Sequence, residues 1–265
     1  MESYDDLFQI NYMYSLVAAS SFTFFTVMFY IVSPWFSKKI SSQYETLDLY
    51  VQHDWNSRVI AVIHASVVTP LAIYVVLIDE EAKRDPVWGN SLVARTAMAL
   101  TEGYMISDFI IVLRYFPLKD AVIYSFHHIA TLYPYTYNVL YGPMPYFGCF
   151  KLATEGSTPF VNIRWFLSTL KRSDSDLYYY NGIIMTGLFF MLRVVPIIPF
   201  WVAIYGTFTT HPMQGITWEM RGSLVIGSLI LDLLNLYWFR KMLHGAKKVM
   251  NRRSLVKEEM KNKGL

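Results

Sequence analysis

The sequence predicts an all-α membrane protein with about seven transmembrane helices. Hydrophobic residues make up 54% of the 265 positions and aromatic residues 17%, whereas only 16% are charged. Seven apolar segments have the length of roughly 20 residues that a helix needs to cross a bilayer. A soluble domain has a far more polar balance, so this composition excludes that class.

The seven segments follow one another with short connections that contain Pro, Gly, Asp or Ser. No basic stretch precedes the first segment, which is also too long for a signal-peptide core, so we expect a retained helix. We find neither an internal repeat nor a long linker, and we therefore expect one domain with the first helix at its periphery. The approximate ranges are 11–36, 56–78, 91–115, 120–140, 143–170, 178–206 and 218–242.

Basic residues alternate between the connections in a way that predicts orientation. One side would carry four basic groups: Lys38 with Lys39, Arg114 with Lys119, Lys171 with Arg172, and the basic residues from Arg240 to Lys263. The other side has Lys83 and Arg84, which neighbouring acidic residues offset. The positive-inside rule then places the N-terminus in the lumen and the C-terminus in the cytosol.

The C-terminal tail ends in Lys261-Asn-Lys263-Gly-Leu265. This spacing resembles the dibasic retrieval signal of endoplasmic reticulum membrane proteins, which acts as an address read by a receptor. We therefore expect residence in the endoplasmic reticulum membrane, with coat proteins as possible partners of the tail. A lysine-rich tail can also produce this spacing by chance.

A pair of histidines inside an apolar segment is the main candidate for chemistry. On a helix, His127, Thr131, Pro134 and Asn138 share one face, which should point into a protein interior because ionisable groups are costly in lipid. His128 is rotated from His127 by about 100°. We expect both histidines to line a cavity, and we regard them as tentative catalytic residues.

Further polar groups fall at a similar depth on other segments. His64, Asp108, His127 and Asp232 each lie roughly 10 to 13 Å from the predicted cytosolic boundary, and Glu155 lies somewhat deeper. Thr158 and Asn162 share a face with Glu155, which Lys151 is placed to neutralise. We expect these groups to line the cavity or bind substrate, with interhelical contact as the alternative. For Arg95, Glu102 and Arg193 we favour the interhelical role.

Metal binding is not expected, because the spacings Glu-x-x-His and His-x-x-x-His do not occur. No cofactor is implied either. The distribution of basic residues bears on membrane orientation and gives no reason to expect a nucleic-acid partner.

The runs Phe116-Pro-Leu-Lys-Asp, His127-His128 and Glu155-Gly-Ser-Thr-Pro-Phe-Val-Asn-Ile-Arg164-Trp-Phe-Leu resemble the TLC-domain family of endoplasmic reticulum membrane proteins. The resemblance implies a barrel of six helices around a lipid-sized cavity, with the first helix outside. In the ceramide synthases of this family the paired histidine belongs to an acyl-transfer site. This chain departs from their His-Asp-x-x-Asp element, because it has one carboxylate, Glu155, where they have two.

Three functions remain open. The first is binding of a membrane lipid or acyl chain in the cavity, with an effect on membrane lipid homeostasis. The second is an acyltransferase of ceramide-synthase type, with acyl-CoA as co-substrate and His127 or His128 as nucleophile or base. The third is a cargo receptor or assembly partner of the early secretory pathway. We expect residues 1–51 to hold the first helix, 52–250 the TLC domain and 251–265 the tail.

Overall fold

The computed structural model describes residues 12–210, 213 and 215–262, with side chains at 248 and 252–262 left aside. The described chain is almost entirely helical, as predicted. The elements are α1 Tyr12–Val27, η2 Met28–Val32, α2 Ser33–Ile40, η3 Tyr44–Thr46, α3 Leu49–Leu77, α4 Glu80–Arg84, α5 Leu92–Tyr115, α6 Leu118–Tyr141, α7 Pro145–Leu152, η4 Ala153–Ser157, α8 Thr158–Thr169, α9 Asp176–Phe189, η5 Phe190–Val194, α10 Ile197–Thr210 and α11 Trp218–Asn262.

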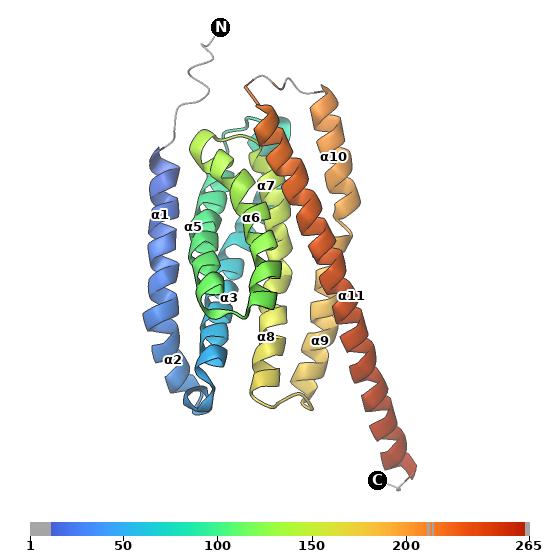
Figure 1. Ribbon diagram of the computed structural model, residues 1–265. Coiled ribbons are helices and arrows are strands. Elements are labelled where there is room, and N and C mark those ends of the chain that lie inside the picture. Colours follow the sequence, from blue (N-terminus) through green and yellow to red (C-terminus); the bar gives the residue numbers. More distant parts are fainter. Residues whose placement is uncertain (1–11, 211–212, 214, 263–265) are drawn as a thin grey trace.

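Five continuous helical stretches in the described part are long and apolar enough to cross a membrane. They are Tyr12–Ile40, Leu49–Leu77, Leu92–Tyr115, Asp176–Thr210 and Trp218–Asn251. Between the third and fourth of these lie α6 and the α7–η4–α8 stretch, which run alongside them in the bundle (Figure 1). Large apolar side chains such as Leu16, Ile31 and Ile198 are exposed on the outside, and polar ones are buried inside. This inverted pattern suits a protein whose solvent is lipid.

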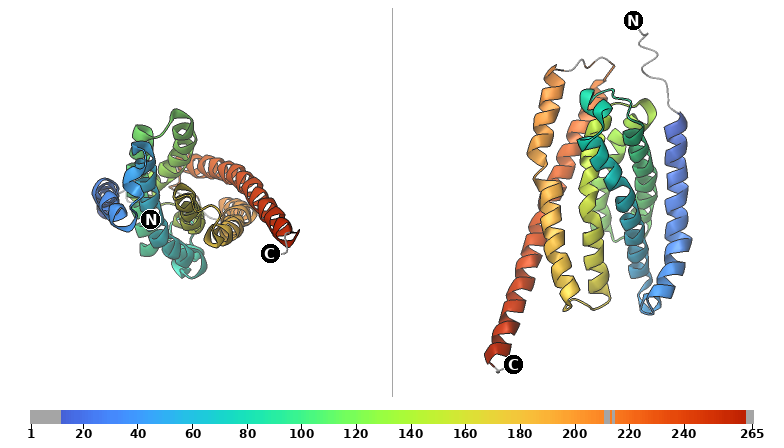
Figure 2. Two further views of the ribbon diagram at one scale, coloured as in Figure 1. Left: turned by 90° about the horizontal axis from the view of Figure 1, so that it is seen from below. Right: turned by 180° about the vertical axis from the view of Figure 1, so that it is seen from behind.

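Six helical spans close into a ring. Around it, α3 packs on α5, α5 on α6, α6 on α11, α11 on α9, α9 on α8, and α8 on α3. Figure 2, seen from below, shows the same arrangement, with α1 standing outside it. The ring agrees with the six-helix barrel that the sequence resemblance implied.

The first helix packs closely on the outside of this ring. A methyl group added at Gly103 of α5 would overlap the backbone of α1 at Ala18 and Phe22. Ser21 of α1 also donates a hydrogen bond of 2.6 Å to the carbonyl of Leu100. Small residues at a helix crossing let backbones approach closely, which stabilises contacts inside a membrane. The first helix is therefore peripheral to the ring but firmly attached to it.

Three segments that the sequence predicted as regular helices contain an irregular turn, and the first of them, expected over 11–36, contains the π-helical turn η2. The segment expected over 143–170 contains the 3₁₀ turn η4 between α7 and α8, and the segment expected over 178–206 contains the π-helical turn η5 between α9 and α10. Thr158-Pro159 follows η4 and Pro196 follows η5, and a proline ring removes a backbone donor and clashes with the preceding turn. Both irregularities change which residues share a helical face.

Helix ends are explained by local signals. Ser91 caps α5 by accepting a hydrogen bond from the backbone N–H of Ala94. Gly142 ends α6 in the left-handed conformation, with φ of 88°, which glycine adopts without a steric cost. α3 begins seven residues before the predicted segment, at Leu49, and α11 runs on to Asn262, because polar helical turns extend both spans beyond their apolar parts.

Candidate functional site

The helical ring surrounds a partly open cavity of about 670 Å³. Its lining comes from α3, α5, α6, α8, α9 and α11, together with α7, η4 and η5; among the described residues, α1, α2 and α10 contribute none. Ligand sites in proteins typically have volumes of roughly 300 to 1,000 Å³, with mostly apolar walls and a few placed polar groups. The apolar walls here include Ala61, Met105, Val112, Val161, Met185, Phe189 and Leu231.

Most of the residues predicted for the site lie in this lining: His64, Asp108, His127, His128, Thr131, Lys151, Glu155, Thr158 and Asn162. Asn138 and Asp232 lie outside it. Asn138 is fully buried and donates a hydrogen bond to the carbonyl of Pro143, which ties down the end of α6. Lys263 is outside the described residues, and the side chain of Lys261 is outside them as well.

His128 is held by hydrogen bonds at both ring nitrogens. Nδ1 lies 2.7 Å from the carbonyl oxygen of Tyr124, which can only accept, so Nδ1 carries a proton. Nε2 lies 3.0 Å from Oδ2 of Asp108, and Ser57 donates to Oδ1 of the same carboxylate at 2.8 Å. The imidazole also stacks on Phe109. This arrangement gives a fixed pair in which one proton lies between the imidazole and the carboxylate.

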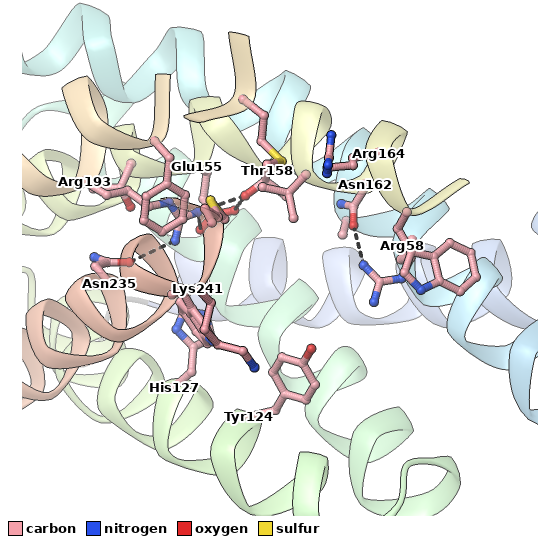
Figure 3. Close-up of a pocket in the computed structure, with 18 of the residues that line it drawn as sticks. Arg58, Tyr124, His127, Glu155, Thr158, Asn162, Arg164, Arg193, Asn235 and Lys241 are labelled. Carbon is pink, nitrogen blue, oxygen red and sulfur yellow. Dashed lines mark hydrogen bonds and ion pairs between the residues drawn. The ribbon is translucent and has the colours of Figure 1, made fainter. Parts of the chain in front are cut away.

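His127 differs from its neighbour. Its ring meets His128 and Trp238 edge to face, at 5.6 and 5.9 Å between centroids. Its Nδ1 is buried and has no hydrogen-bond partner in the described structure. A buried polar atom of this kind is costly unless something occupies the space beside it. His127, which Figure 3 shows projecting into the cavity, is thus an imidazole available to a ligand.

A second polar cluster faces the histidines from the other side of the cavity. Arg193 in η5 donates to Glu155 Oε1 at 3.2 Å, Thr158 Oγ1 at 2.9 Å, Ser157 Oγ at 2.9 Å and Asn235 Oδ1 at 3.2 Å. Thr158 in turn donates to Glu155 Oε2 at 2.6 Å. Figure 3 shows this network as a compact group. Because it joins η4, α8, η5 and α11, it fixes these elements relative to one another.

The pairing of these charges corrects two predictions. Lys151 does not neutralise Glu155; it donates to Asp232 at 2.6 Å, and Trp201 donates to the other oxygen of Asp232 at 2.9 Å. Arg193, expected only to join helices, does so while also lining the cavity. The physical reason is the 3₁₀ turn η4, which alters the rotation between Lys151 and Glu155 from that of a continuous α-helix.

His64 is buried, and most of its contacts are packing contacts. The hydroxyl of Thr101 donates its proton to the carbonyl of Ala97, so toward His64 it can only accept. The imidazole therefore donates its Nε2–H to Thr101, at 3.2 Å. Its ring stacks on Tyr104 at 4.0 Å. His64 also lines the cavity, and its Nδ1 has no hydrogen-bond partner among the described residues.

Sequence reasoning missed several residues of the lining. Arg58 forms an ion pair with Asp54 at 2.8 Å, donates to Asn162 at 3.0 Å and lies over the ring of Trp165. Arg58 lies inside the predicted segment 56–78, but it was not among the residues predicted for the site. The spacing of Asp54, Arg58, Ala61 and His64, which places them on one helical face, was a usable signal.

These features define a multi-pass helical membrane protein whose candidate site lies among its spans. The TLC domain profile matches residues 54–244, from the second turn of α3 to the middle part of α11. The chain belongs to the TLC domain family.

Relatives from distant organisms extend over most of the chain. TLC domain-containing protein 4 from Homo sapiens is 35% identical over 252 residues, covering 93% of this chain and 96% of that protein. TLC domain-containing protein 4-B from Danio rerio is 33% identical, with 88% and 89% covered. Topoisomerase I damage affected protein 4 from Saccharomyces cerevisiae is 27% identical, with 86% and 83% covered. The similarity therefore extends beyond the residues that the family profile matches.

Proposed function

We propose that this protein binds a membrane lipid or a fatty acyl chain in the cavity and thereby contributes to membrane lipid homeostasis. The observation that carries the proposal is the cavity of about 670 Å³, which combines apolar walls with a polar centre inside a ring of membrane-spanning helices. An amphiphile matches this combination, since its chain suits the apolar walls and its polar group suits the imidazole and carboxylate groups.

Filling the cavity tests the proposal directly. Ala61 lines the cavity on α3, whereas Ser66 lies on the same helix, is exposed, and does not line it. We expect Ala61→Phe to reduce the lipid that co-purifies with the protein in mild detergent, as measured by mass spectrometry. Ser66→Phe should leave that lipid unchanged. Equal lipid content in Ala61→Phe, Ser66→Phe and wild type would contradict binding in this cavity.

The histidine side of the cavity favours a second function, acyl transfer from acyl-CoA. His127 presents an imidazole to the cavity, and the His128–Asp108 pair beside it has a fixed hydrogen-bonding arrangement. An imidazole in this position is suited to serve as base or nucleophile toward an acyl group. The test is release of free coenzyme A thiol from palmitoyl-CoA by the purified protein in the presence of a long-chain amino alcohol, whose amine or hydroxyl group takes the acyl group as the thiol leaves. Release that His127→Asn abolishes would establish an enzyme; no release from wild type would reject it.

We also propose the endoplasmic reticulum as the location, with a lumenal N-terminus and a cytosolic C-terminus. The ends of α2, α5, α8 and α11 lie at the same end of the bundle, which gathers the basic connections and the tail there (Figure 1). Protection from protease of a tag placed after Leu265, in sealed microsomes, would contradict this orientation.

The proposed retrieval signal has its own test. We expect Lys261→Ser combined with Lys263→Ser to let the protein reach later secretory compartments, which microscopy would reveal. Unchanged reticular localisation would exclude a dominant role for these lysines and for coat proteins that would bind them. The division into residues 1–51, 52–250 and 251–265 is part of the same proposal.

A further inference from the structure

A second, smaller cavity adjoins the inner end of the cavity described above. Its volume is about 30 Å³, and four residues belong to the linings of both cavities: Thr131, Tyr135, Lys151 and Leu231. A void needs about 10 to 15 Å³ to hold one water molecule, so this one has room for one or two groups of that size. The four shared side chains form the wall between the two cavities.

Two neighbouring helices show that the cavities lie end to end. On α11 the larger cavity is lined by residues within 231–250, and the smaller one by residues within 220–231. On α6 the corresponding ranges are 124–135 and 130–137. The smaller cavity therefore continues the larger one toward the end of the bundle where α6 ends and α11 begins (Figure 1).

The two cavities differ in polarity. The larger one contains the paired charges of the histidine and arginine sides, whereas the smaller one has mostly apolar walls. The charged residue in the lining of the smaller cavity, Lys151, is paired with Asp232 at 2.6 Å. The hydroxyl of Tyr135 donates to the carbonyl of Gly148 at 2.9 Å. Apolar residues that line the smaller cavity include Met98, Ala130, Met144, Phe147, Met220 and Leu224. Hydrocarbon suits this cavity, because the polar groups at its wall already have partners.

The wall has three members that are tied down and one that is not. Hydrogen bonds hold Tyr135 and Lys151, and Thr131 donates to the carbonyl of His127 at 3.0 Å. Leu231 is half-buried and has only apolar side-chain atoms. Behind it, methionine side chains fill the space, and methionine adapts its shape easily to what it packs against. The size of Leu231 therefore decides how far an apolar chain can pass.

From these observations we propose that Leu231 sets the length of the hydrocarbon chain that the protein binds. This rests on the function proposed above, in which the polar group of the ligand lies beside His127. Thr131 of the wall is one helical turn, about 6 Å, from His127, and Tyr137 of the smaller cavity is about 15 Å from it along α6. A long chain that leaves the imidazole in this direction has to pass Leu231 and end in the smaller cavity.

Substitutions at Leu231 test the proposal in both directions. Leu231→Ala joins the two cavities, so the acyl chains of the lipid that co-purifies in mild detergent should become longer. Leu231→Phe narrows the passage, so they should become shorter. Mass spectrometry measures the chain lengths, with the lipids of the same cells as reference, and thermal unfolding checks that each variant is folded. Leu233→Ala is the matched control, because Leu233 is an exposed residue of α11 outside both linings.

A titration gives the size of the effect. The purified full-length protein is titrated with radiolabelled saturated fatty acids, from lauric to behenic acid in steps of two methylene groups. The longest acid that wild type binds well marks its limit. Burying a methylene group contributes about 0.8 kcal/mol, so the next longer acid should bind Leu231→Ala roughly fifteenfold more tightly than wild type.

Filling the smaller cavity should reverse this gain. Ala130 is buried and lines the smaller cavity but not the larger one. Ala130→Val adds two methyl groups there, so Leu231→Ala combined with Ala130→Val should return the limit to that of wild type.

Unchanged chain lengths in both Leu231→Ala and Leu231→Phe, or an equal change in Leu233→Ala, would overturn the role of Leu231 while lipid binding itself stands. The absence of co-purifying lipid and of fatty acid binding in wild type would overturn both proposals.

Discussion

The two polar clusters that face the cavity are built on backbones of different kinds. The histidine cluster, with His128, Asp108 and Ser57, lies on the uninterrupted helices α3, α5 and α6. The arginine cluster, with Glu155 and Arg193, lies on the 3₁₀ turn η4 and the π turn η5. Irregular turns inside helices are often found at functional sites, and they need side-chain contacts to hold them in place. The comparison suggests that the arginine cluster stabilises the ring, whereas the histidine cluster presents chemistry to the cavity.

Removing Arg193 should have the largest effect on stability. Arg193→Met deletes four hydrogen bonds and leaves the Glu155 carboxylate buried without its cation. We expect a loss of about 3 to 5 kcal/mol, the usual result of breaking a buried ion pair from one side. Thermal unfolding in detergent measures it. Arg193→Met combined with Glu155→Gln should recover part of the loss, and no recovery would show that the ion pair is not the cause.

Asp108→Asn should have a smaller effect in the histidine cluster. The amide nitrogen of the new asparagine can donate to the unprotonated Nε2 of His128, and its oxygen can still accept from Ser57, so the helices remain joined. We expect a loss of about 1 to 2 kcal/mol, in the range for polar contacts between membrane helices. The same thermal assay applies. A loss as large as that of Arg193→Met would contradict the difference between the clusters.

Removing one hydroxyl group from each cluster compares the stability of the two clusters directly. Thr158→Val removes one bond accepted from Arg193 and one donated to Glu155, whereas Ser57→Ala removes a single bond to Asp108. We expect about 1 to 1.5 kcal/mol for Thr158→Val and roughly half of that for Ser57→Ala. The ratio of the two shifts in unfolding temperature is the measurement. Ser57→Ala as the more destabilising change would reverse the proposed roles.

His127→Asn should be nearly neutral for stability, with a cost below about 1 kcal/mol, because Nδ1 of His127 has no hydrogen-bond partner in the described structure. If the imidazole contacts the ligand, the variant should nevertheless alter the lipid that co-purifies. Mass spectrometry and thermal unfolding are measured on the same preparation. If the co-purifying lipid and the lipid composition of the cell are both unchanged, His127 has only a packing role.

The same difference in backbone explains what could be predicted from the sequence. His127, His128 and Asp108 were placed toward a common interior because regular helices preserve their periodicity over many residues. The expected Lys151–Glu155 pairing was wrong because η4 changes the rotation over that interval. For Arg193 we favoured the interhelical role because polar contacts between membrane helices are common, and the sequence did not reveal the turn η5 that holds it. Hydrophobic periodicity carries no signal for a single 3₁₀ or π turn, and so the partners of charged groups near such turns cannot be derived from it.

The length of α11 has a mechanical consequence. Its 45 residues span about 68 Å, more than twice the roughly 30 Å hydrocarbon thickness of a bilayer. The same helix contributes Asn235 and Lys241 to the cavity wall and continues past the bundle (Figure 2). About 32 Å of helix separate Lys241 from Asn262, so a tilt of about 10° at the wall would swing the far end by roughly 5 Å. A small change in the tilt of α11 at the cavity wall would therefore be amplified at the far end of the helix.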